Sequence, residues 1–246
     1  MHWAEKIADR IIKKNPDKEE YVCAAGISPS GSIHIGNFRD IATSLFVAKA
    51  IEKRGKKARL LFSWDEFDRF RKVPANVKAI DPDNKMEQYI GRPYTSVPNP
   101  FDTEHENYAK YFEDEFMKSI KKFGIEMDYR YQTDMYTSGA YRDDIIEAIQ
   151  KRKEIFDILD SFRTQDAQEG ERDAYFPVSI FCPECHKDMT KITSISEDGT
   201  VAEYECECGH KGTFDFKKDT GCKLAWKIDW PMRWRYEKVD FEPGGK

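Results

Sequence analysis

A strand, turn, helix and strand within the first 64 residues most restrict the folds open to this chain. Residues 21–25 form a short apolar run that ends at Gly26, which is typical of a buried strand. Residues 36–54 carry apolar side chains at helical spacing and stop at Gly55, and residues 58–64 form a second apolar run. We interpret this pattern as a βαβ unit with a right-handed crossover, so we expect an α/β fold with a parallel sheet.

The same patterns predict further elements along the chain. Amphipathic helices are expected at residues 3–14, 104–123 and 139–160, and strands at residues 126–132 and 223–228. Thr103 and Glu106 have the spacing of a capping box, which predicts a helix start at residue 104. Residues 67–102 are rich in Pro, Asn, Asp and Arg with little periodicity, which predicts a long irregular connection near the functional site.

Composition limits the class of protein. The 246 residues hold 40 Lys and Arg against 45 Asp and Glu, a net charge of -5, so nucleic acid could be bound only through a local basic patch. Apolar runs fall well short of the roughly 20 residues that span a bilayer. The first residues also lack the apolar core of a signal peptide. We therefore expect a cytoplasmic protein without membrane insertion.

Four of the six cysteines are paired in a metal-binding pattern. Zn²⁺ prefers four tetrahedral ligands, and short cysteine pairs on turns supply two thiolates each. We predict a structural zinc ribbon at about residues 176–216 whose ligands are Cys182, Cys185, Cys206 and Cys208. His210 could replace Cys208 as the fourth ligand. A disulfide pair or ordinary core cysteines are the alternatives. They fit poorly because the segment between the pairs is polar.

The turn after the first strand is the expected phosphate-binding element. It lies between a buried strand and a helix start, where doubly wound sheets present free amides to phosphate. The sequence is neither a Walker loop nor a Gly-x-Gly-x-x-Gly motif. His34 could contact a phosphate while Gly36 lets a flat base lie against the backbone. Taken alone, a histidine at this position is more often a helix cap.

Three motifs together resemble one enzyme family. The run Ser28-Pro29-Ser30-Gly31-x-x-His34-Ile35-Gly36-Asn37 resembles the signature of class I aminoacyl-tRNA synthetases, whose usual form is His-Ile-Gly-His. The Asn ending, with Asp65-x-x-Asp68-x-x-Arg71-Lys72-Val73-Pro74 and Leu224-x-Trp226-Lys227-x-Asp229-Trp230-Pro231-x-x-Trp234, is similar to class I lysyl-tRNA synthetases. The resemblance covers nearly the whole chain. It implies a Rossmann-type doubly wound parallel sheet with an inserted connective region that contains the zinc ribbon.

The resemblance also implies a reaction and its partners. L-lysine is joined to the α-phosphate of ATP, and the lysyl group is then passed to tRNA(Lys). Mg²⁺ accompanies ATP, Zn²⁺ is structural, and no protein nucleophile is needed. A further metal site known near residues 99–112 in some relatives is not expected, because only His105 and acidic residues occur there.

The implied domain organisation has three parts. Residues 1–100 would form the first half of the nucleotide-binding domain, residues 101–222 the mostly helical insertion, and residues 223–246 the return to the sheet. The second family signature, Lys-Met-Ser-Lys-Ser, is absent, and residues 188–191 are no substitute. We therefore expect this chain to be the N-terminal half of a larger enzyme that continues into an anticodon-binding domain.

Motif matching assigns the site residues. It implies ATP binding by Ser30, His34, Gly36 and Asn37, of which His34 and Asn37 are the catalytic candidates. For lysine it implies Gly26, Ser28 and Trp226, the last as a cation–π partner. The residues alone suggest Asp65, Asp68 and Asp229 as balancing charges for the ammonium, or else as helix caps or ion-pair partners of Arg71 or Arg233.

Three other functions fit parts of the pattern. Glutamyl or glutaminyl synthetases share the turn and the insertion, and Arg39 or Arg71 could then face a substrate carboxylate. A nucleotidyltransferase of the pantothenate synthetase type would share the fold, although the zinc insertion counts against it. A nucleic-acid-binding zinc-ribbon module without catalysis fits worst, given the acidic balance and the complete nucleotide-binding turn.

Overall fold

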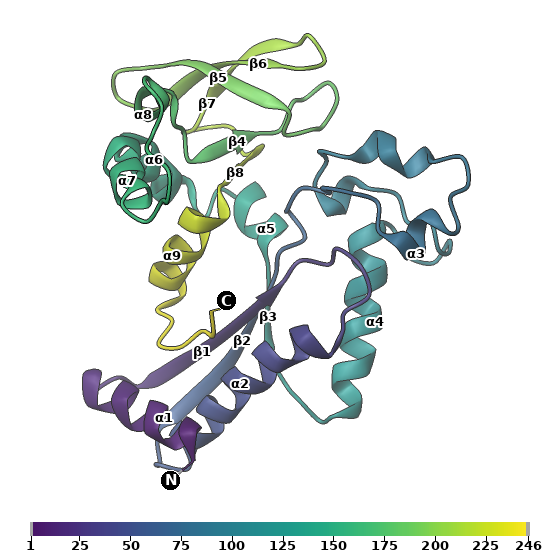
Figure 1. The fold of residues 1–246 in the computed structure, drawn as a ribbon. Coiled ribbons are helices and arrows are strands. Elements are labelled where there is room, and N and C mark those ends of the chain that lie inside the picture. The colour runs from purple at the N-terminus through teal and green to yellow at the C-terminus, as the bar shows by residue number, and fades with distance from the viewer. Residues whose placement is uncertain (1, 245–246) are drawn as a thin grey trace.

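A parallel three-stranded sheet forms the base of the molecule. The computed structural model describes residues 2–244. Strands β1 (Glu20–Ile27), β2 (Lys57–Trp64) and β3 (Asp128–Tyr131) lie in the order β1-β2-β3, with β1 and β2 paired in parallel from end to end (Figure 1). The α/β fold and the βαβ unit are therefore as predicted, with each strand within two residues of its expected bounds.

Helices cover one face of this sheet. α1 (Trp3–Lys14) and α2 (Ile35–Glu52) pack on it with α4 (Tyr108–Lys122). Their shared core contains Ala8, Ile41, Ile51, Phe62 and Phe116, and burial of these apolar side chains is the main force that holds the layer together. α1 matches its predicted range. α4 begins four residues later than expected, because Asn107 rather than Thr103 caps it by accepting a hydrogen bond from the Lys110 amide.

Residues 237–241 contact the other face of the sheet and the edge of β1 that is not paired with β2. Val22, Ala24 and Leu61 pack against Val239, while Arg59 and Arg130 pair with Glu237. Phe241 pairs in parallel with Cys23. The sheet thus has neighbours on both sides of β1, which fits a Rossmann-like sheet; helices on both faces, the doubly wound arrangement, stay a prediction.

The connection after β2 is more ordered than predicted. It contains α3 (Ala75–Lys78) and two 3-10 helices, η1 (Lys85–Tyr89) and η2 (Tyr94–Ser96). These short elements share a core with α4 that includes Phe70, Val77, Tyr94, Tyr108 and Phe112. Because the apolar residues of this core are far apart in the sequence, no local periodicity predicted the short helices.

The remaining elements form the upper part of Figure 1 around a second large core. The helices of this part are α5 (Gln132–Thr137), α6 (Arg142–Gln150), α7 (Arg152–Asp160), α8 (Glu171–Ala174) and α9 (Trp226–Glu237). β4 (Val178–Ile180) pairs with β8 (Cys222–Leu224), and β5 (Thr190–Ile195), β6 (Val201–Cys206) and β7 (Lys211–Asp215) form an antiparallel sheet.

Two predicted elements differ here. The helix expected over 139–160 is interrupted at Lys151 (φ -92°, ψ 12°), although neither glycine nor proline marks the break. The strand expected over 223–228 spans only Cys222–Leu224, so Trp226 starts α9 instead of lying on a strand. Within residues 2–244, none of the helices is both long and apolar enough to cross a membrane.

Candidate functional site

The site is built around the turn that follows β1. The turn leaves the carboxyl end of a strand that has β2 on one side and residues 240–241 on the other, which is where ligands bind in open α/β sheets. Gly26 lies so close to β2 that a Cβ atom there would stand 3.2 Å from the Ser63 carbonyl oxygen. A larger residue at this position would push the turn away from the sheet.

His34 and Asn37 begin α2. The Gly36 amide donates to His34 Nδ1 over 3.1 Å, and the His34 amide donates to Asn37 Oδ1 over 3.4 Å. This is a reciprocal capping box, so the simple capping role considered for His34 is present. Because Nδ1 accepts a hydrogen bond, a neutral imidazole carries its proton on Nε2, which is then free to donate. His34 itself is exposed.

Gly36 is needed for this cap. A Cβ atom on Gly36 would stand 2.8 Å from Cε1 and 2.9 Å from Nδ1 of His34, closer than atoms normally approach. Ser30 lies earlier in the turn, where its carbonyl oxygen accepts a hydrogen bond from the Tyr108 hydroxyl. Hydrogen bonds therefore hold the turn at Ser30 and at the start of α2.

Five charged side chains form one continuous ion chain beside the turn. Arg233 bridges Asp65, at 2.6 Å, and Asp229, at 3.0 Å. Lys223 continues the chain, since its Nζ atom lies 2.9 Å from Asp229 and 3.0 Å from Asp68. The order is thus Asp65, Arg233, Asp229, Lys223, Asp68, with a carboxylate at each end.

Burial makes these pairs electrostatically strong. Although burial alone would raise it, Lys223 and Arg233 hold the pKa of Asp229 below its usual value. Burial likewise opposes the charge of Lys223, but Asp229 and Asp68 hold its pKa above the usual value. Asp65 differs, because burial raises its pKa even though Arg233 favours its ionised form.

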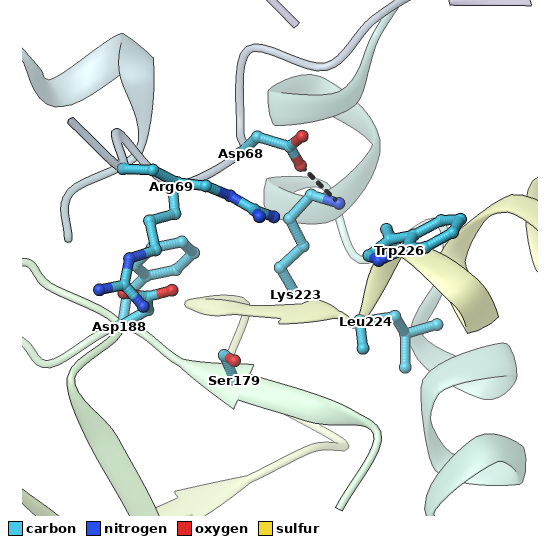
Figure 2. Close-up of a pocket in the computed structure, with 10 residues that line it drawn as sticks. Asp68, Arg69, Ser179, Asp188, Lys223, Leu224 and Trp226 are labelled. Atoms are coloured by element: carbon cyan, nitrogen blue, oxygen red, sulfur yellow. Dashed lines mark ion pairs between the residues drawn. The ribbon is translucent and has the colours of Figure 1, made fainter. Parts of the chain in front are cut away.

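Asp68 is the end of the ion chain that faces a pocket. Its side chain is 27% exposed, against 0% for Asp229 and 8% for Asp65. Ser28 Oγ donates to Asp68 Oδ2 over 2.8 Å, which ties the carboxylate to the turn. Figure 2 shows the Asp68–Lys223 pair at the pocket, with Trp226 beside Lys223.

The pocket has a volume of about 510 Å³. It is lined by Asp68, Arg69, Arg71, Ser179, Phe181, Asp188, Lys223, Leu224, Ala225 and Trp226. Trp226 is 57% exposed, although the Nζ atom of Lys227 already lies 5.7 Å from the centroid of its ring. An aromatic face in the same pocket as a partly exposed carboxylate suits a cationic group.

The structure brings together only some of the predicted lysine-site residues. Ser28 contacts Asp68, and Trp226 lines the same pocket as Asp68, whereas Gly26 lies nearer Asp65, whose Oδ2 would stand 3.8 Å from a Cβ atom there. Asp65 and Asp229 do not line it and pair with Arg233, so their role as balancing charges for the ammonium stays a prediction. The alternative ion-pair role with Arg233 is what the structure shows, in a buried position instead of on the surface.

Sequence reasoning missed Lys223 and Tyr136. Lys223 lay in an expected strand without an assigned role, and Tyr136 lay in a region where no helix was predicted. The Tyr136 hydroxyl donates to Asp229 Oδ1 over 2.5 Å. The sequence signal for Lys223 was weak, since it is a charged residue at the start of the expected strand, which contains a second lysine, Lys227.

The four predicted cysteine ligands do come together. Their Sγ atoms all lie within 4.8 Å of one another, with Cys182 to Cys208 at 3.7 Å and Cys185 to Cys206 at 3.6 Å. Four sulfurs about 2.3 Å from a tetrahedral zinc would be about 3.8 Å apart. The cluster is therefore compatible with Zn²⁺.

His210 is not part of this cluster. Its imidazole lies near Tyr204 and Gly212, where a Cβ atom on Gly212 would stand 3.1 Å from Nε2. Its carbonyl oxygen instead accepts a hydrogen bond from the Cys206 amide, which shapes the turn between the last two cysteines. The geometry thus favours Cys208 over His210 as the fourth ligand.

Comparison with known proteins gives one consistent result. Residues 1–246 match the family described as tRNA synthetases class I (K). The chain is 43% identical over 246 residues to a lysine–tRNA ligase of Treponema pallidum (strain Nichols) and 43% identical over 247 residues to one of Thermococcus kodakarensis. A lysine–tRNA ligase of Pyrococcus horikoshii is 39% identical over 246 residues. Each match covers 100% of this chain but 45% of the relative.

Proposed function

The chain belongs to the family of class I tRNA synthetases of the lysine type, and on that premise we propose that it forms the catalytic half of a lysine–tRNA ligase. The reaction would activate L-lysine with ATP and pass the lysyl group to tRNA(Lys). The observation that carries the proposal is the pocket lined by Asp68 and Trp226, where a buried ion chain ends in a partly exposed carboxylate.

The mixed charges of the pocket support lysine as the substrate. Lysine has two ammonium groups and one carboxylate, and the pocket offers the carboxylate of Asp68 to the first kind of group and the guanidinium of Arg71 to the second. Asp68 can receive one ammonium group, and the face of Trp226 can attract a cation. Gly26 and Ser28 would contact the same substrate from the turn, while Asp65 and Asp229 would act on it through Arg233 and Lys223.

One observation favours a glutamyl or glutaminyl enzyme instead. Arg71 lines the pocket and is exposed, so it could meet a substrate carboxylate. Arg69 and Lys223 are less available because carboxylates of this chain already pair with them. Arg39 lies on α2 next to Asp40, outside the residues that line the pocket. For the lysine enzyme, Arg71 would receive the carboxylate end of lysine or a phosphate of ATP.

The start of α2 is the proposed ATP subsite. His34 Nε2 would donate to the phosphates, Gly36 would leave room for adenine, and Ser30 and Asn37 would support the turn. The carboxylate oxygen of lysine attacks the α-phosphorus, and pyrophosphate leaves. A ribose hydroxyl of the tRNA then attacks the lysyl carbonyl carbon, and AMP leaves. This chain contributes positioning and charge stabilisation, and Mg²⁺ bound with ATP supplies further neutralisation of the phosphates.

We further propose that Cys182, Cys185, Cys206 and Cys208 hold a structural Zn²⁺. The closed set of four sulfurs suits a structural site. The ion would stabilise the β5–β7 sheet as a zinc ribbon at about residues 176–216, within a connective insertion of residues 101–222. Residues 1–100 and 223–246 would be the two parts of the nucleotide-binding domain. We propose a cytoplasmic location, where tRNA is charged for protein synthesis.

Binding of an intermediate analogue tests the proposed function. The chain would be titrated calorimetrically with a non-hydrolysable lysyl-adenylate analogue, with the glutamyl and glutaminyl analogues as controls. Selective binding of the lysyl analogue is the expected result. Preference for either control would assign the pocket to another synthetase of the same class. If none of the three binds, the adenylate pocket proposed for this chain is wrong.

A further inference from the structure

The first cysteine turn is attached directly to the loop that carries Asp68. Residues 182–189 contain Cys182 and Cys185, and we call them the cysteine turn. Two hydrogen bonds join this turn to the loop: the Asp188 amide donates to the Gly91 carbonyl oxygen over 2.8 Å, and Arg92 Nε donates to the Cys185 carbonyl oxygen over 3.1 Å. The turn thus rests on residues 91 and 92.

Arg69 makes a second attachment, one residue from Asp68. Its guanidinium lies 3.4 Å from Asp188 Oδ1 and 3.4 Å from the sulfur of Met189. Asp188 is mostly buried, since its side chain is 11% exposed, and it lines the same pocket as Asp68 (Figure 2). An ion pair in such surroundings is screened less by water than one on the surface.

Residues 68–70 and 91–94 form a short antiparallel ribbon. The Phe70 amide donates to the Arg92 carbonyl oxygen over 2.7 Å, the Gly91 amide to the Phe70 carbonyl oxygen over 2.9 Å, and the Tyr94 amide to the Asp68 carbonyl oxygen over 3.0 Å. The backbone of Asp68 is therefore fixed by a ribbon whose other strand touches the cysteine turn.

The fit between turn and ribbon is close. Gly91 has φ +98°, and a Cβ atom there would stand 3.1 Å from Cβ of Lys187. The cysteine turn itself is held by local hydrogen bonds, including Cys182 amide to Lys187 carbonyl and His186 amide to Cys182 carbonyl. A change in the conformation of the turn would therefore reach residue 91 directly.

We infer that the four-cysteine cluster positions Asp68 in the pocket, with Arg69 and Arg92 as the positioning residues that connect them. A metal held by the four thiolates fixes the cysteine turn, the turn fixes the ribbon, and the ribbon holds Asp68 against Ser28 and Lys223. This inference rests on the proposed function for the identity of the ligand, but the mechanical connection stands on the contacts alone.

Two readouts test it. The first is hydrogen exchange at the amides of Phe70, Gly91 and Tyr94, compared between the zinc-loaded and chelated protein. The second is the affinity for the lysyl-adenylate analogue. We expect chelation to accelerate exchange at these amides while residues 22–25 stay protected, and to weaken analogue binding by about tenfold. By linkage, the analogue strengthens zinc binding by the same factor, measured by competition with a chromophoric chelator.

Variants separate this connection from general destabilisation. R69M/R92M removes both side-chain contacts and leaves the Asp188–Gly91 backbone hydrogen bond, so chelation should have a smaller effect on both readouts than in the unmodified chain. R69K/R92K can restore one donor at each position and recovers part of the coupling. The matched control is R10M, an exposed arginine on α1, which leaves the coupling as in the unmodified chain.

The outcomes are distinct for the two proposals. If chelation leaves exchange at Phe70, Gly91 and Tyr94 unchanged, or releases residues 22–25 equally, the inference is wrong. If R69M/R92M responds to chelation as strongly as the unmodified chain, Arg69 and Arg92 are not the connection. Failure of the unmodified zinc-loaded chain to bind the analogue contradicts the proposed function, while the exchange experiment still decides the inference.

Discussion

The Tyr136 hydroxyl donates to Asp229 Oδ1 over 2.5 Å and so joins α5 to α9 across 93 positions of the sequence. The same hydroxyl accepts a hydrogen bond from the Leu224 amide over 3.3 Å. All three groups are buried, so water cannot replace a partner that is lost.

Replacement of this hydroxyl tests its contribution to stability. Y136F leaves one oxygen of a buried carboxylate and one buried amide without that partner, which should lower the free energy of unfolding by about 1–3 kcal/mol. Urea unfolding measures the change. The control is Y236F, at a tyrosine that is 43% exposed, which should change stability by less than about 0.5 kcal/mol. Equal effects of the two variants would argue against the buried network.

Asp68 is expected to dominate ligand affinity. D68N removes the charge that faces the pocket but keeps the size of the side chain, so the lysyl-adenylate analogue should bind roughly tenfold to a hundredfold more weakly. Calorimetric titration measures this change. The control is D17N, at an exposed aspartate between α1 and β1, which should bind the analogue as the unmodified chain does. Unchanged affinity in D68N would remove Asp68 from the site.

His34 should have two separable roles. H34A removes the cap of α2 and should lower the free energy of unfolding by about 0.5–2 kcal/mol, whereas H34N retains a capping oxygen and should stay close to the unmodified stability. Both variants lack Nε2, so both should bind the adenylate analogue more weakly. Unfolding and titration of the same two proteins distinguish the roles. If H34N binds normally, the imidazole does not contact the phosphates.

Glu66 should make stability depend on pH. Burial raises its pKa to about 8, although the Thr133 and Gln132 amides donate to it and favour its ionised form. A raised folded-state pKa means that the folded chain keeps a proton that the unfolded chain has lost. Stability is thus highest below about pH 4.5 for this group and falls as the pH rises towards 8, by up to about 1.4 kcal/mol per pH unit. E66Q should remove this dependence, as seen by urea unfolding at several pH values.

Removal of metal should unfold one part of the molecule before the rest. Elemental analysis should find about one zinc per chain, and none in C185S/C206S. Chelation should accelerate amide exchange in β5, β6 and β7, because the metal would hold together the two cysteine pairs that flank this sheet. Protection in β1 and β2 should persist. A reduced protein without bound zinc would contradict the proposed metal site.

Local signals predicted the first part of the fold well. The unit from β1 to β2 follows from two apolar runs, a helical pattern and Gly55, all of which lie close together in sequence. The start of α4 was wrong because Thr103 and Glu106 have capping-box spacing, yet the chain uses Asn107. Sequence alone does not show whether Thr103 or Asn107 caps the helix, because tertiary contacts decide which of the two is used.

The candidate site was only partly predictable. The cysteine pairs and the turn after β1 are short motifs, so the spacing of their residues was enough to predict which residues belong to each. The ion chain joins Asp65 to Arg233, which are 168 positions apart, and no local pattern gives such a pairing. Three aspartates looked equivalent in the sequence, whereas the structure exposes Asp68 and buries Asp65 and Asp229. Burial decides which charge a ligand can reach.

The pairing of β1 with residues 240–241 has a consequence for synthesis of the chain. The Val22 amide donates to Asp240, 218 positions later, and the Ala24 amide donates to the Phe241 carbonyl oxygen. At about 5–20 residues per second, the ribosome needs roughly 10–45 s to supply that partner. During this interval β1 can pair with β2 but has an open edge, to which another chain could add. The order of translation thus leaves the edge of β1 exposed to aggregation until residues 240–241 have been made.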